Sequence, residues 1–594
     1  MTDVLSRRDL DFLLYEWLDV ESLTSSERFS EHSKDTFDAV LDLCADIAHK
    51  HFEPHNKLSD ATEPTMRPDG TVQMIDDVKA ALDVYAAAGL IAGQFDETLG
   101  GMQLPTTVAR AAMAWFQAAN ASTSSYPFLT MANANLIATY GTAEQIDDYV
   151  RPMLEGKYFG TMCLSEPQAG SSLADITTRA VKQDDGSYRV TGTKMWISGG
   201  DHELTENIVH LVLAKAAGGG PGVKGISLFV VPKFLPDGTR NDVTLVGLNH
   251  KMGNRGTTNT LLNFGDGTNA AADDVPGAVG FLVGEEHRGL SYMFHMMNEA
   301  RIGVGFLAIA LGYVGYMKSV EYAKVRTQGR PLGAKDPATA PVALIEHADV
   351  RRMLLAQKSY VEGALALGLY CSKLVDEQDS TDDETVKNES TLLLDLLTPI
   401  AKAWPSQWCL EANSLAIQVH GGYGYTRDYD VEQYYRDNRL NPIHEGTTGI
   451  QGLDLLGRKV TMQGGAGVVL LGSRLAETIE RARPMSGDTG VFAADLETKW
   501  NDIVTVTSAL WATGDPAVAL ANSTVYLDAM GHIVIAWMWL EQLTAVEGRT
   551  GDFYDGKRQA ARYFFRYELP KVATQLDLLS SLDRTTLDMK PEWF

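Results

Sequence analysis

The feature that most limits how this chain can fold is a switch in hydrophobic period, from helical to strand-like and back. Apolar residues follow a helical period from about residue 33 to 155, with breaks at Gly89 and around Glu97–Gly101. From residue 159 the pattern becomes short runs separated by Gly, Asp and Asn, which indicate strands and turns. Helical spacing returns near residue 286. We therefore expect a helical domain, a β domain and a helix bundle, in that order.

The length of the chain predicts several domains of a mostly α, α+β protein. A chain of 594 residues exceeds one ordinary hydrophobic core. The segments with strand composition in the middle region are 188–192, 208–213, 226–231, 243–246 and 261–264. The predicted parts are an N-terminal extension over 1–40, a helical domain over 41–158, a β domain over 159–285, a helix bundle over 286–457 and an additional C-terminal helical domain over 458–594.

Charge and cysteine usage exclude several classes of partner and site. The chain has 51 basic and 77 acidic residues, and its formal charge of -26 disfavours nucleic acid and anionic lipid surfaces as partners. The four cysteines (Cys44, Cys163, Cys371 and Cys409) have no paired or CxxC spacing, so we predict neither a disulfide framework nor a metal site. A reducing compartment is the simpler interpretation.

Two other stretches have simple structural interpretations. The N-terminus lacks the apolar core of a secretory signal, so we expect a cytoplasmic protein. The longest uncharged apolar run lies between Arg301 and Lys318 and is shorter than the roughly 20 residues that span a bilayer. We expect a buried core helix there and no membrane insertion. The acidic stretch from Asp376 to Glu384 predicts a solvated loop between two helices.

One carboxylate stands in a turn whose setting suits a general base. Glu445 lies in Pro442–Gln451, after an apolar isoleucine and histidine and directly before a glycine. If this turn is buried, desolvation raises the carboxylate pKa toward values useful for proton abstraction. The same residues are also compatible with an exposed loop that closes one helix and caps the next.

Two segments at the start of the β domain could hold a ring or a phosphate. In Met162–Ser172 a proline and a glycine bend the chain and serines offer donors, although a plain turn explains the segment equally well. In Lys194–Gly200, strand alternation would place Trp196 and Ser198 on one face. A planar group could then lie on the indole and bond near the hydroxyl, while a core tryptophan is the alternative.

Two further segments lie at predicted helix ends in the bundle. The adjacent glycines of Gln418–Tyr425 permit close approach of a ligand to the backbone, but the segment lacks the GxGxxG pattern and follows no strand. A Rossmann fold is therefore disfavoured. The cations of Tyr322–Arg330 suit a phosphate, with ordinary helix-end charge pairing as the alternative.

Taken together, these segments resemble the acyl-CoA dehydrogenase family of flavoenzymes. The resemblance rests on LSEPQAGSS, MWISGG, AKVRTQGR, IQVHGGYGY and IHEGTTGIQ, in this order and spacing. It covers about residues 40–457 and implies the acyl-CoA dehydrogenase fold. The N-terminal extension and the residues beyond 457 resemble a bacterial branch of the family that has an additional C-terminal helical domain.

The resemblance implies an FAD-dependent enzyme that converts an acyl-CoA thioester into a trans-2-enoyl-CoA. Glu445 takes the position of the base that removes the α-proton, while the β-hydrogen leaves as hydride to flavin N5. The implied substrate is a short or medium acyl chain or 3-methylmercaptopropionyl-CoA, and the implied electron acceptor is electron-transfer flavoprotein. A homodimer or a pair of dimers is also implied. The alternatives are an acyl-CoA oxidase and a non-catalytic flavin-binding interaction protein.

The resemblance also assigns individual positions. Expected near the flavin ring are Met162, Leu164, Ser165, Trp196 and Ser198. Expected at phosphate and pantetheine are Gly170 and Ser171. Two groups of residues are expected at the diphosphate and adenosine end of FAD. The first group comes from a neighbouring subunit and comprises Arg326, Gln328, Gln418, Gly421 and Gly422. The second group comprises Thr447 and Gly449. Expected on the substrate side are Ser171, Arg301 and Gly446. The chain departs from common family residues at Ser165, Gln168, Ser198, Gly329 and Gly449 but not at the base position, and the two serines keep the hydroxyl of the common threonine.

Overall fold

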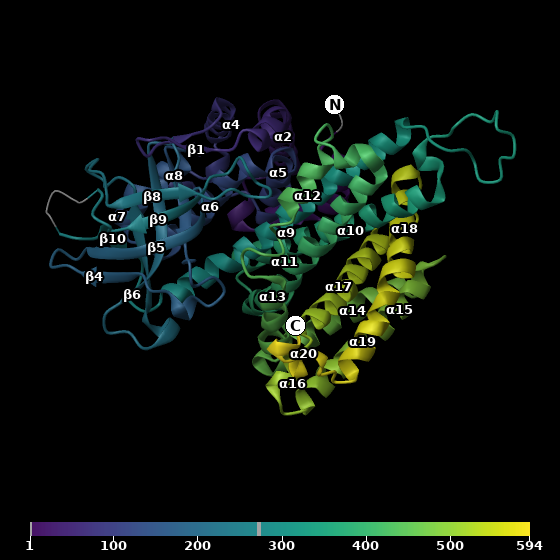
Figure 1. Cartoon of the computed structure of the whole chain (residues 1–594). Helices are drawn as coiled ribbons and strands as arrows, with labels where there is room; N and C mark the ends of the chain where they lie inside the picture. The colour runs from purple at the N-terminus through teal and green to yellow at the C-terminus, as the bar shows by residue number, and fades with distance from the viewer. Residues whose placement is uncertain (1–2, 270–274) are drawn as a thin grey trace. The chain divides into compact units, whose positions relative to one another are not determined.

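The chain divides into two compact units in the computed structural model, which describes residues 3–269 and 275–594 (Figure 1). The backbone alone is described for residues 295–298. The first unit, called here the sheet unit, comprises Ala39–Leu104 and Ala119–Ala300. The second, called the bundle unit, comprises Met1–Asp38, Pro105–Ala118 and Arg301–Phe594. Each unit is therefore assembled from segments that are distant in the sequence.

The sheet unit begins with helices, as its periodicity predicts. They are α2 (Lys34–Ile47, mostly in this unit), α3 (Asn56–Ala61), α4 (Asp76–Ala87), α6 (Ala121–Tyr140), α7 (Ala143–Gln145) and α8 (Arg151–Leu154). Asn120 starts α6, since its side chain accepts a hydrogen bond from the Thr123 amide at 3.0 Å and satisfies a free donor of the first turn. The predicted breaks at Gly89 and Glu97–Gly101 are confirmed, because no α-helix crosses either of them.

The strands of this unit form one larger sheet and a separate short pair. They are β1 (Thr65–Met66), β2 (Val72–Gln73), β3 (Tyr158–Cys163), β4 (Arg179–Lys182), β5 (Tyr188–Ser198), β6 (Asn207–Ala216), β7 (Ile226–Pro232), β8 (Val243–Leu248), β9 (Asn259–Phe264) and β10 (Ala278–Leu282). All five predicted strand segments are confirmed. The pattern does not predict the other strands, which are β1, β2, β3, β4 and β10.

The larger sheet closes on itself through β10. Its order is β10-β7-β6-β4-β5-β9-β8, with β3 beside β6 in a parallel pair. Because β10 pairs with both β7 and β5, five of the strands form a ring around a core that includes Tyr188, Phe229 and Phe264. β9 and β8 extend the sheet from β5 outside this ring, and the register of the β5–β9 pairing shifts between Lys194 and Ile197.

Long helices make up the bundle unit. They are α1 (Arg7–Asp11), α5 (Thr106–Ala119), α9 (Gly289–Val325, from Arg301 in this unit), α10 (Ala348–Ser380), α11 (Glu384–His420), α12 (Val431–Asn438) and α13 (Thr448–Asp454). α10 and α11 pack along their lengths, as the teal and green ribbons of Figure 1 show. This pairing of long helices agrees with the predicted bundle.

Additional C-terminal helices belong to the same unit. They are α14 (Ala466–Ala482), α15 (Thr489–Ala512), α16 (Pro516–Leu520), α17 (Ser523–Ala545), α18 (Asp552–Tyr563), α19 (Val572–Ser580) and α20 (Thr585–Asp588). α17 packs against α10, α11 and α13 as well as against α14 and α15. Gln463, Gly464 and Gly465 have left-handed φ values just before α14, so the helical path is interrupted there.

The apolar run of α9 is buried, as predicted for Arg301–Lys318. Val304, Phe306 and Ile309 are each 1% exposed. By length and composition alone α9 could cross a membrane, but 89% of its most apolar window is buried inside the protein. The core helix of a soluble protein passes the same test, so these properties are weak evidence for a membrane span.

The prediction of a solvated loop over Asp376–Glu384 is wrong for its first half. α10 continues to Ser380, and Asp376 is buried. Its carboxylate caps the start of α5 by accepting hydrogen bonds from the Thr107 amide at 2.9 Å and the Thr107 hydroxyl at 2.5 Å. A partner about 270 residues earlier in the chain therefore holds this acid in the interior.

A buried charge cluster joins the N-terminal segment to the C-terminal helices. Lys557 of α18 forms ion pairs with Asp9 of α1 and, at 2.9 Å, with Glu362 of α10. The Tyr313 hydroxyl of α9 donates to the same Asp9 at 2.9 Å. Because removal of one member of such a cluster leaves an unpaired buried charge, these contacts fix α1 and α18 on the bundle.

Candidate active site

Glu445 lies in a strained turn between α12 and α13, called here the base turn (Asn441–Thr447). Its φ of 51° is left-handed, a conformation that non-glycine residues adopt rarely and most often at functional sites. The next residue, Gly446, has a φ of 86°, and a Cβ there would lie 2.5 Å from the Gln451 side chain. Thr447 ends the turn as the cap of α13, since its hydroxyl accepts from the Ile450 amide at 3.3 Å.

Side chains from two helices hold the backbone of the base turn. Gln451 of α13 donates to the carbonyls of Glu445 at 3.1 Å and Gly446 at 3.3 Å. Lys402 of α11 donates to the carbonyls of Asn441 and Gly446, both at 2.7 Å. The Glu445 amide donates no hydrogen bond to the described residues, so it is free to bond a ligand oxygen.

Burial sets the protonation of this turn. It raises the pKa of the Glu445 carboxyl, and the charges of Lys402 and Arg301 oppose that rise. Burial lowers the pKa of Lys402 to about 7, an effect that the Glu445 charge opposes. The same cause lowers the pKa of His444 to about 3, so this imidazole is neutral near pH 7. Near pH 7, the free-energy difference between the protonated and the ionised forms of the Glu445 carboxyl is therefore smaller in the protein than in water.

Arg301 is buried beside this turn and is engaged by the protein. Its guanidinium forms an ion pair with Asp454 of α13 at 2.9 Å, and Asp454 also pairs with Arg458 at 2.9 Å. The Nε atom of Arg301 is buried and has no partner among the described residues. Arg301 thus lies in the electrostatic environment of Glu445, while its expected contact with substrate remains a prediction.

In the sheet unit, residues at the end of β3 alternate between partly exposed and buried side chains. Met162 and Leu164 are partly exposed, whereas Cys163 between them is buried. This alternation places the two expected flavin-ring contacts on one side of the strand. Ser165 follows as the strand ends, and the Ser165 carbonyl accepts from the Met195 amide at 3.0 Å. The two expected flavin segments, Met162–Ser172 and Lys194–Gly200, are therefore adjacent.

A buried ion pair lies beneath these two segments. Lys194 pairs with Glu166 at 3.0 Å and donates to the Leu164 carbonyl at 3.0 Å. Glu166 also accepts from the amides of Thr177 at 2.7 Å and Thr178 at 3.0 Å. These donors and the lysine lower the pKa of Glu166 to about 2 against the effect of burial. The pair fixes the relative position of the two segments.

The regular alternation that predicts one face for Trp196 and Ser198 is broken in the structure. β5 has a bulge between Lys194 and Ile197, and Trp196 itself has a left-handed φ of 65°. The bulge turns the indole outward, so that it is 59% exposed, which excludes the alternative of a core tryptophan. Ser198 accepts a hydrogen bond from Asn259 of β9 at 3.2 Å.

The predicted phosphate segment between these strands is exposed. Gly170 and Ser171 follow a tight turn in which Glu166 and Ala169 form a bridge. A Cβ at Gly170 would meet nothing within 4 Å, so the space above this backbone is open. The plain-turn interpretation therefore describes the geometry correctly, and it leaves room for a ligand.

The ends of α9 and α11 meet in the bundle unit. Tyr322 stacks on His420 with ring centroids 4.2 Å apart, and the Arg326 guanidinium lies 5.7 Å from the Tyr423 ring centroid. Gly421 ends α11 with a φ of 61°. The contact places Arg326 beside the segment that follows α11, and the predicted positions at these helix ends are Arg326, Gln328, Gln418, Gly421 and Gly422. Thr447 and Gly449 lie apart from them in the chain, in the cap and first turn of α13.

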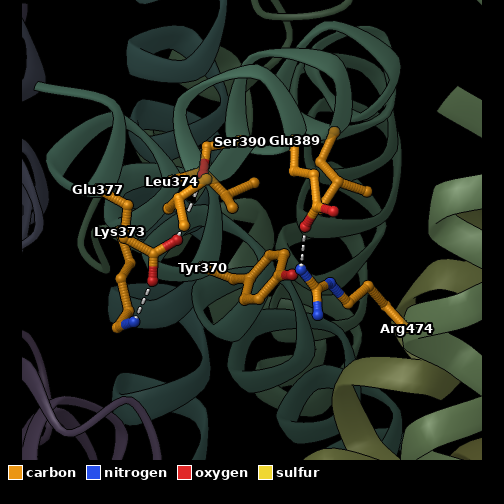
Figure 2. A pocket seen from close by; sticks show the side chains of 9 residues that line it. Tyr370, Lys373, Leu374, Glu377, Glu389, Ser390 and Arg474 are labelled. Atoms are coloured by element: carbon orange, nitrogen blue, oxygen red, sulfur yellow. Dashed lines mark hydrogen bonds and ion pairs between the residues drawn. The ribbon is translucent and has the colours of Figure 1, made fainter. Parts of the chain in front are cut away.

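A cavity elsewhere in the bundle unit contains none of the predicted residues. Its volume is about 260 Å³, and it lies among α10, α11 and α14 (Figure 2). Its cations are already paired, Lys373 with Glu377 and Arg474 with Glu389, the latter at 2.7 Å. Because these charges neutralise each other, the cavity shows no preference for a charged ligand such as coenzyme A.

Lys402, Gln451, Glu166 and Lys194 are structurally important residues that sequence reasoning did not single out. Lys194 and Glu166 lie inside the two segments predicted to contact the flavin, but the sequence does not show that both side chains are buried. Lys402 lies in the middle of a helix, 43 positions before Glu445, where an isolated lysine gives no signal of its own.

Comparison with known families covers most of the chain. Three family models match in order: "Acyl-CoA dehydrogenase, N-terminal domain" over 35–157, "Acyl-CoA dehydrogenase, middle domain" over 161–266 and "Acyl-CoA dehydrogenase, C-terminal domain" over 287–460. The chain belongs to the acyl-CoA dehydrogenase family. A fourth model, "Acetyl-CoA dehydrogenase C-terminal like", matches this acyl-CoA dehydrogenase over 471–590, in the additional C-terminal helices.

Full-length relatives agree with this assignment. This acyl-CoA dehydrogenase is 34% identical to 3-methylmercaptopropionyl-CoA dehydrogenase of Ruegeria pomeroyi over 96% of each chain. It is 33% identical to the broad-specificity linear acyl-CoA dehydrogenase FadE5 of Mycobacterium tuberculosis over 98% of each chain. Its fold resembles that of an acyl-CoA dehydrogenase of Bacillus anthracis complexed with FAD, with a TM-score of 0.74, 18% identity and coverage of 94% and 93% of the two chains.

As a member of this family, the protein is an FAD-dependent oxidoreductase. Its own residues fit a flavin. The exposed Trp196 indole, the open side of β3 and the unobstructed backbone at Gly170 supply an aromatic surface, an apolar edge and free space within one unit.

Proposed function

We propose that the protein removes the α-proton and the β-hydrogen of an acyl-CoA thioester to give a trans-2-enoyl-CoA, with Glu445 as the base. The observation that carries this proposal is the setting of Glu445, a partly buried carboxylate whose pKa burial raises and whose turn is held by Gln451 and Lys402. A base with a raised pKa is better matched to a weakly acidic C–H bond.

The free amide of Glu445 supports the same proposal. An α-C–H bond of a thioester becomes acidic only when the carbonyl is polarised as the proton leaves. The Glu445 amide, which bonds no described residue, can donate to that carbonyl oxygen. A donor of this kind typically stabilises the developing negative charge by about 3–4 kcal/mol. Gly446 then matters because it allows the turn to present both the carboxylate and the amide.

The contacts to the cofactor are part of the proposal. FAD, when bound, supplies the acceptor for the hydride that leaves the β-carbon. Trp196 and Ser198 would contact its ring, and the segment that contains Met162, Leu164 and Ser165 would contact its pyrimidine edge. Gly170 and Ser171 would lie near phosphate and pantetheine, which their open surroundings permit.

A second copy of the chain is proposed to complete the cofactor site. The cluster at the ends of α9 and α11 combines an exposed arginine with aromatic rings, a composition that binds a diphosphate and an adenine. In this proposal Arg326, Gln328, Gln418, Gly421 and Gly422 serve the FAD of a neighbouring subunit in a homodimer or a pair of dimers.

The proposed substrate is a short or medium acyl chain, with 3-methylmercaptopropionyl-CoA as a candidate, and the proposed acceptor is electron-transfer flavoprotein in the cytoplasm. The substrate is supported by the names of full-length relatives, which include a butyryl-CoA dehydrogenase of Syntrophomonas wolfei at 30% identity. An acyl-CoA oxidase is the alternative, since it would share Glu445 and the flavin contacts.

Anaerobic mixing of the FAD-loaded protein with butyryl-, octanoyl-, palmitoyl- and 3-methylmercaptopropionyl-CoA tests these proposals. We expect rapid loss of flavin absorbance with short or medium chains. Fast reduction by longer chains alone would refute the proposed substrate class. Production of hydrogen peroxide in air at the rate of turnover, without an added acceptor, would identify an oxidase.

A further inference from the structure

We infer that Lys402 is a positioning residue that holds the base turn and acts as the counter-charge of Glu445. The inference rests on the proposed role of Glu445 as base and goes beyond it, because it assigns part of the control of that base to a fully buried lysine on another helix.

The geometry is specific. Lys402 lies inside α11 with its side chain fully buried, at 0% exposure. Its ammonium donates to the Asn441 and Gly446 carbonyls, which stand on either side of Glu445, at 2.7 Å each. Hydrogen bonds from an ionised donor are about twice as strong as neutral ones, so one side chain clamps both ends of the strained turn.

The side chains around Lys402 make Glu445 its natural counter-charge. Arg301 of α9 is also cationic, and His444 of the turn is neutral near pH 7 because burial lowers its pKa to about 3. The Arg301 charge is satisfied by Asp454 at 2.9 Å. No carboxylate of the described residues lies within ion-pair distance of Lys402, and Glu445 is the acid whose charge acts on it.

This arrangement couples the base to the lysine. While Glu445 is ionised, the two charges attract across the buried turn, which lowers the pKa of Glu445 against the effect of burial. When Glu445 takes the α-proton, the attraction is lost and the lysine keeps only its two carbonyl contacts. While it carries its proton, Lys402 therefore favours the ionised form of the base, and removal of its charge raises the pKa of Glu445.

Two neutral variants separate the clamp from the charge. Lys402→Gln retains N–H donors for the carbonyls, whereas Lys402→Met retains only the length of the side chain. Lys459→Met is the matched control, since Lys459 is a buried lysine with its own partner, Asp395. The reaction to follow is exchange of the α-hydrogens of acetyl-CoA into D₂O by the FAD-loaded proteins, read by mass spectrometry. Acetyl-CoA has α-hydrogens but no β-carbon to oxidise, so exchange reports the base alone.

We expect the pH midpoint of exchange to rise by about one unit or more in both Lys402 variants. The limiting exchange rate should fall about tenfold or more in Lys402→Met and less in Lys402→Gln. Lys459→Met should keep the wild-type midpoint. If Lys402→Met does not fold, the shift in Lys402→Gln alone decides.

The failures of the two proposals are distinguishable. Loss of exchange in Glu445→Gln together with wild-type midpoints in the Lys402 variants would overturn the role of Lys402 and leave Glu445 as the base. Exchange at the wild-type rate in Glu445→Gln would instead overturn the proposed function, and the inference with it.

Discussion

Arg301 of α9 forms a buried ion pair with Asp454 of α13 at 2.9 Å. The pair anchors α13, the helix that follows the base turn, to α9. The family resemblance predicts a substrate-side position for Arg301, and in the structure its positive charge acts on the pKa of Glu445.

Replacement of Asp454 by asparagine should destabilise the bundle unit. The change leaves the Arg301 charge buried without its partner, a situation that typically costs about 3–5 kcal/mol. We expect a clear fall in the melting temperature of the FAD-loaded protein, measured by calorimetry. The matched control is Asp588→Asn, which removes an exposed i,i+4 partner of Arg584 and should change stability by about 0.5 kcal/mol or less. Equal effects of the two changes would contradict the structural role of the Arg301 pair.

Asp376 should give the protein an unusual dependence of stability on pH. Burial raises the pKa of this carboxyl from 3.8 to about 7 in the folded state. Between these values the folded state holds a proton that the unfolded state has released, so the free energy of unfolding should fall as the pH rises through this range. Asp376→Asn removes the titrating group, so its melting temperature should fall less than that of the wild type between about pH 5 and 7. Parallel curves would show that Asp376 does not titrate in this range.

Trp196 should contribute to flavin binding and little to folding. Its indole is 59% exposed, so truncation to alanine creates no cavity in the core. Loss of an aromatic surface under the ring should weaken FAD binding about tenfold, measured by quenching of flavin fluorescence. Trp593→Ala is the control, because Trp593 is 60% exposed near the C-terminus, and it should bind FAD like the wild type. Unchanged affinity in Trp196→Ala would refute the ring contact.

Much of this architecture could be predicted from periodicity, while the features that tune the site could not. The order of helices, strands and helices follows from local spacing, which a single sequence displays. The bulge at Trp196 could not be predicted, since counting alternate residues assumes a regular strand. The interior position of Asp376 depends on Thr107, and the role of Lys402 depends on Gly446, partners that lie far away in the sequence. Only the folded structure shows which charged side chains are buried away from solvent.

The most direct test of the central claim is anaerobic reduction of the flavin by butyryl-CoA in Glu445→Gln. The glutamine keeps the shape of the side chain but cannot accept the α-proton, so we predict reduction about 100-fold slower or more, with FAD still bound. Glu411→Gln is the matched control, because Glu411 is another partly buried carboxyl of the bundle whose pKa burial raises, and it should reduce like the wild type. Flavin reduction in Glu445→Gln at the wild-type rate would contradict the account.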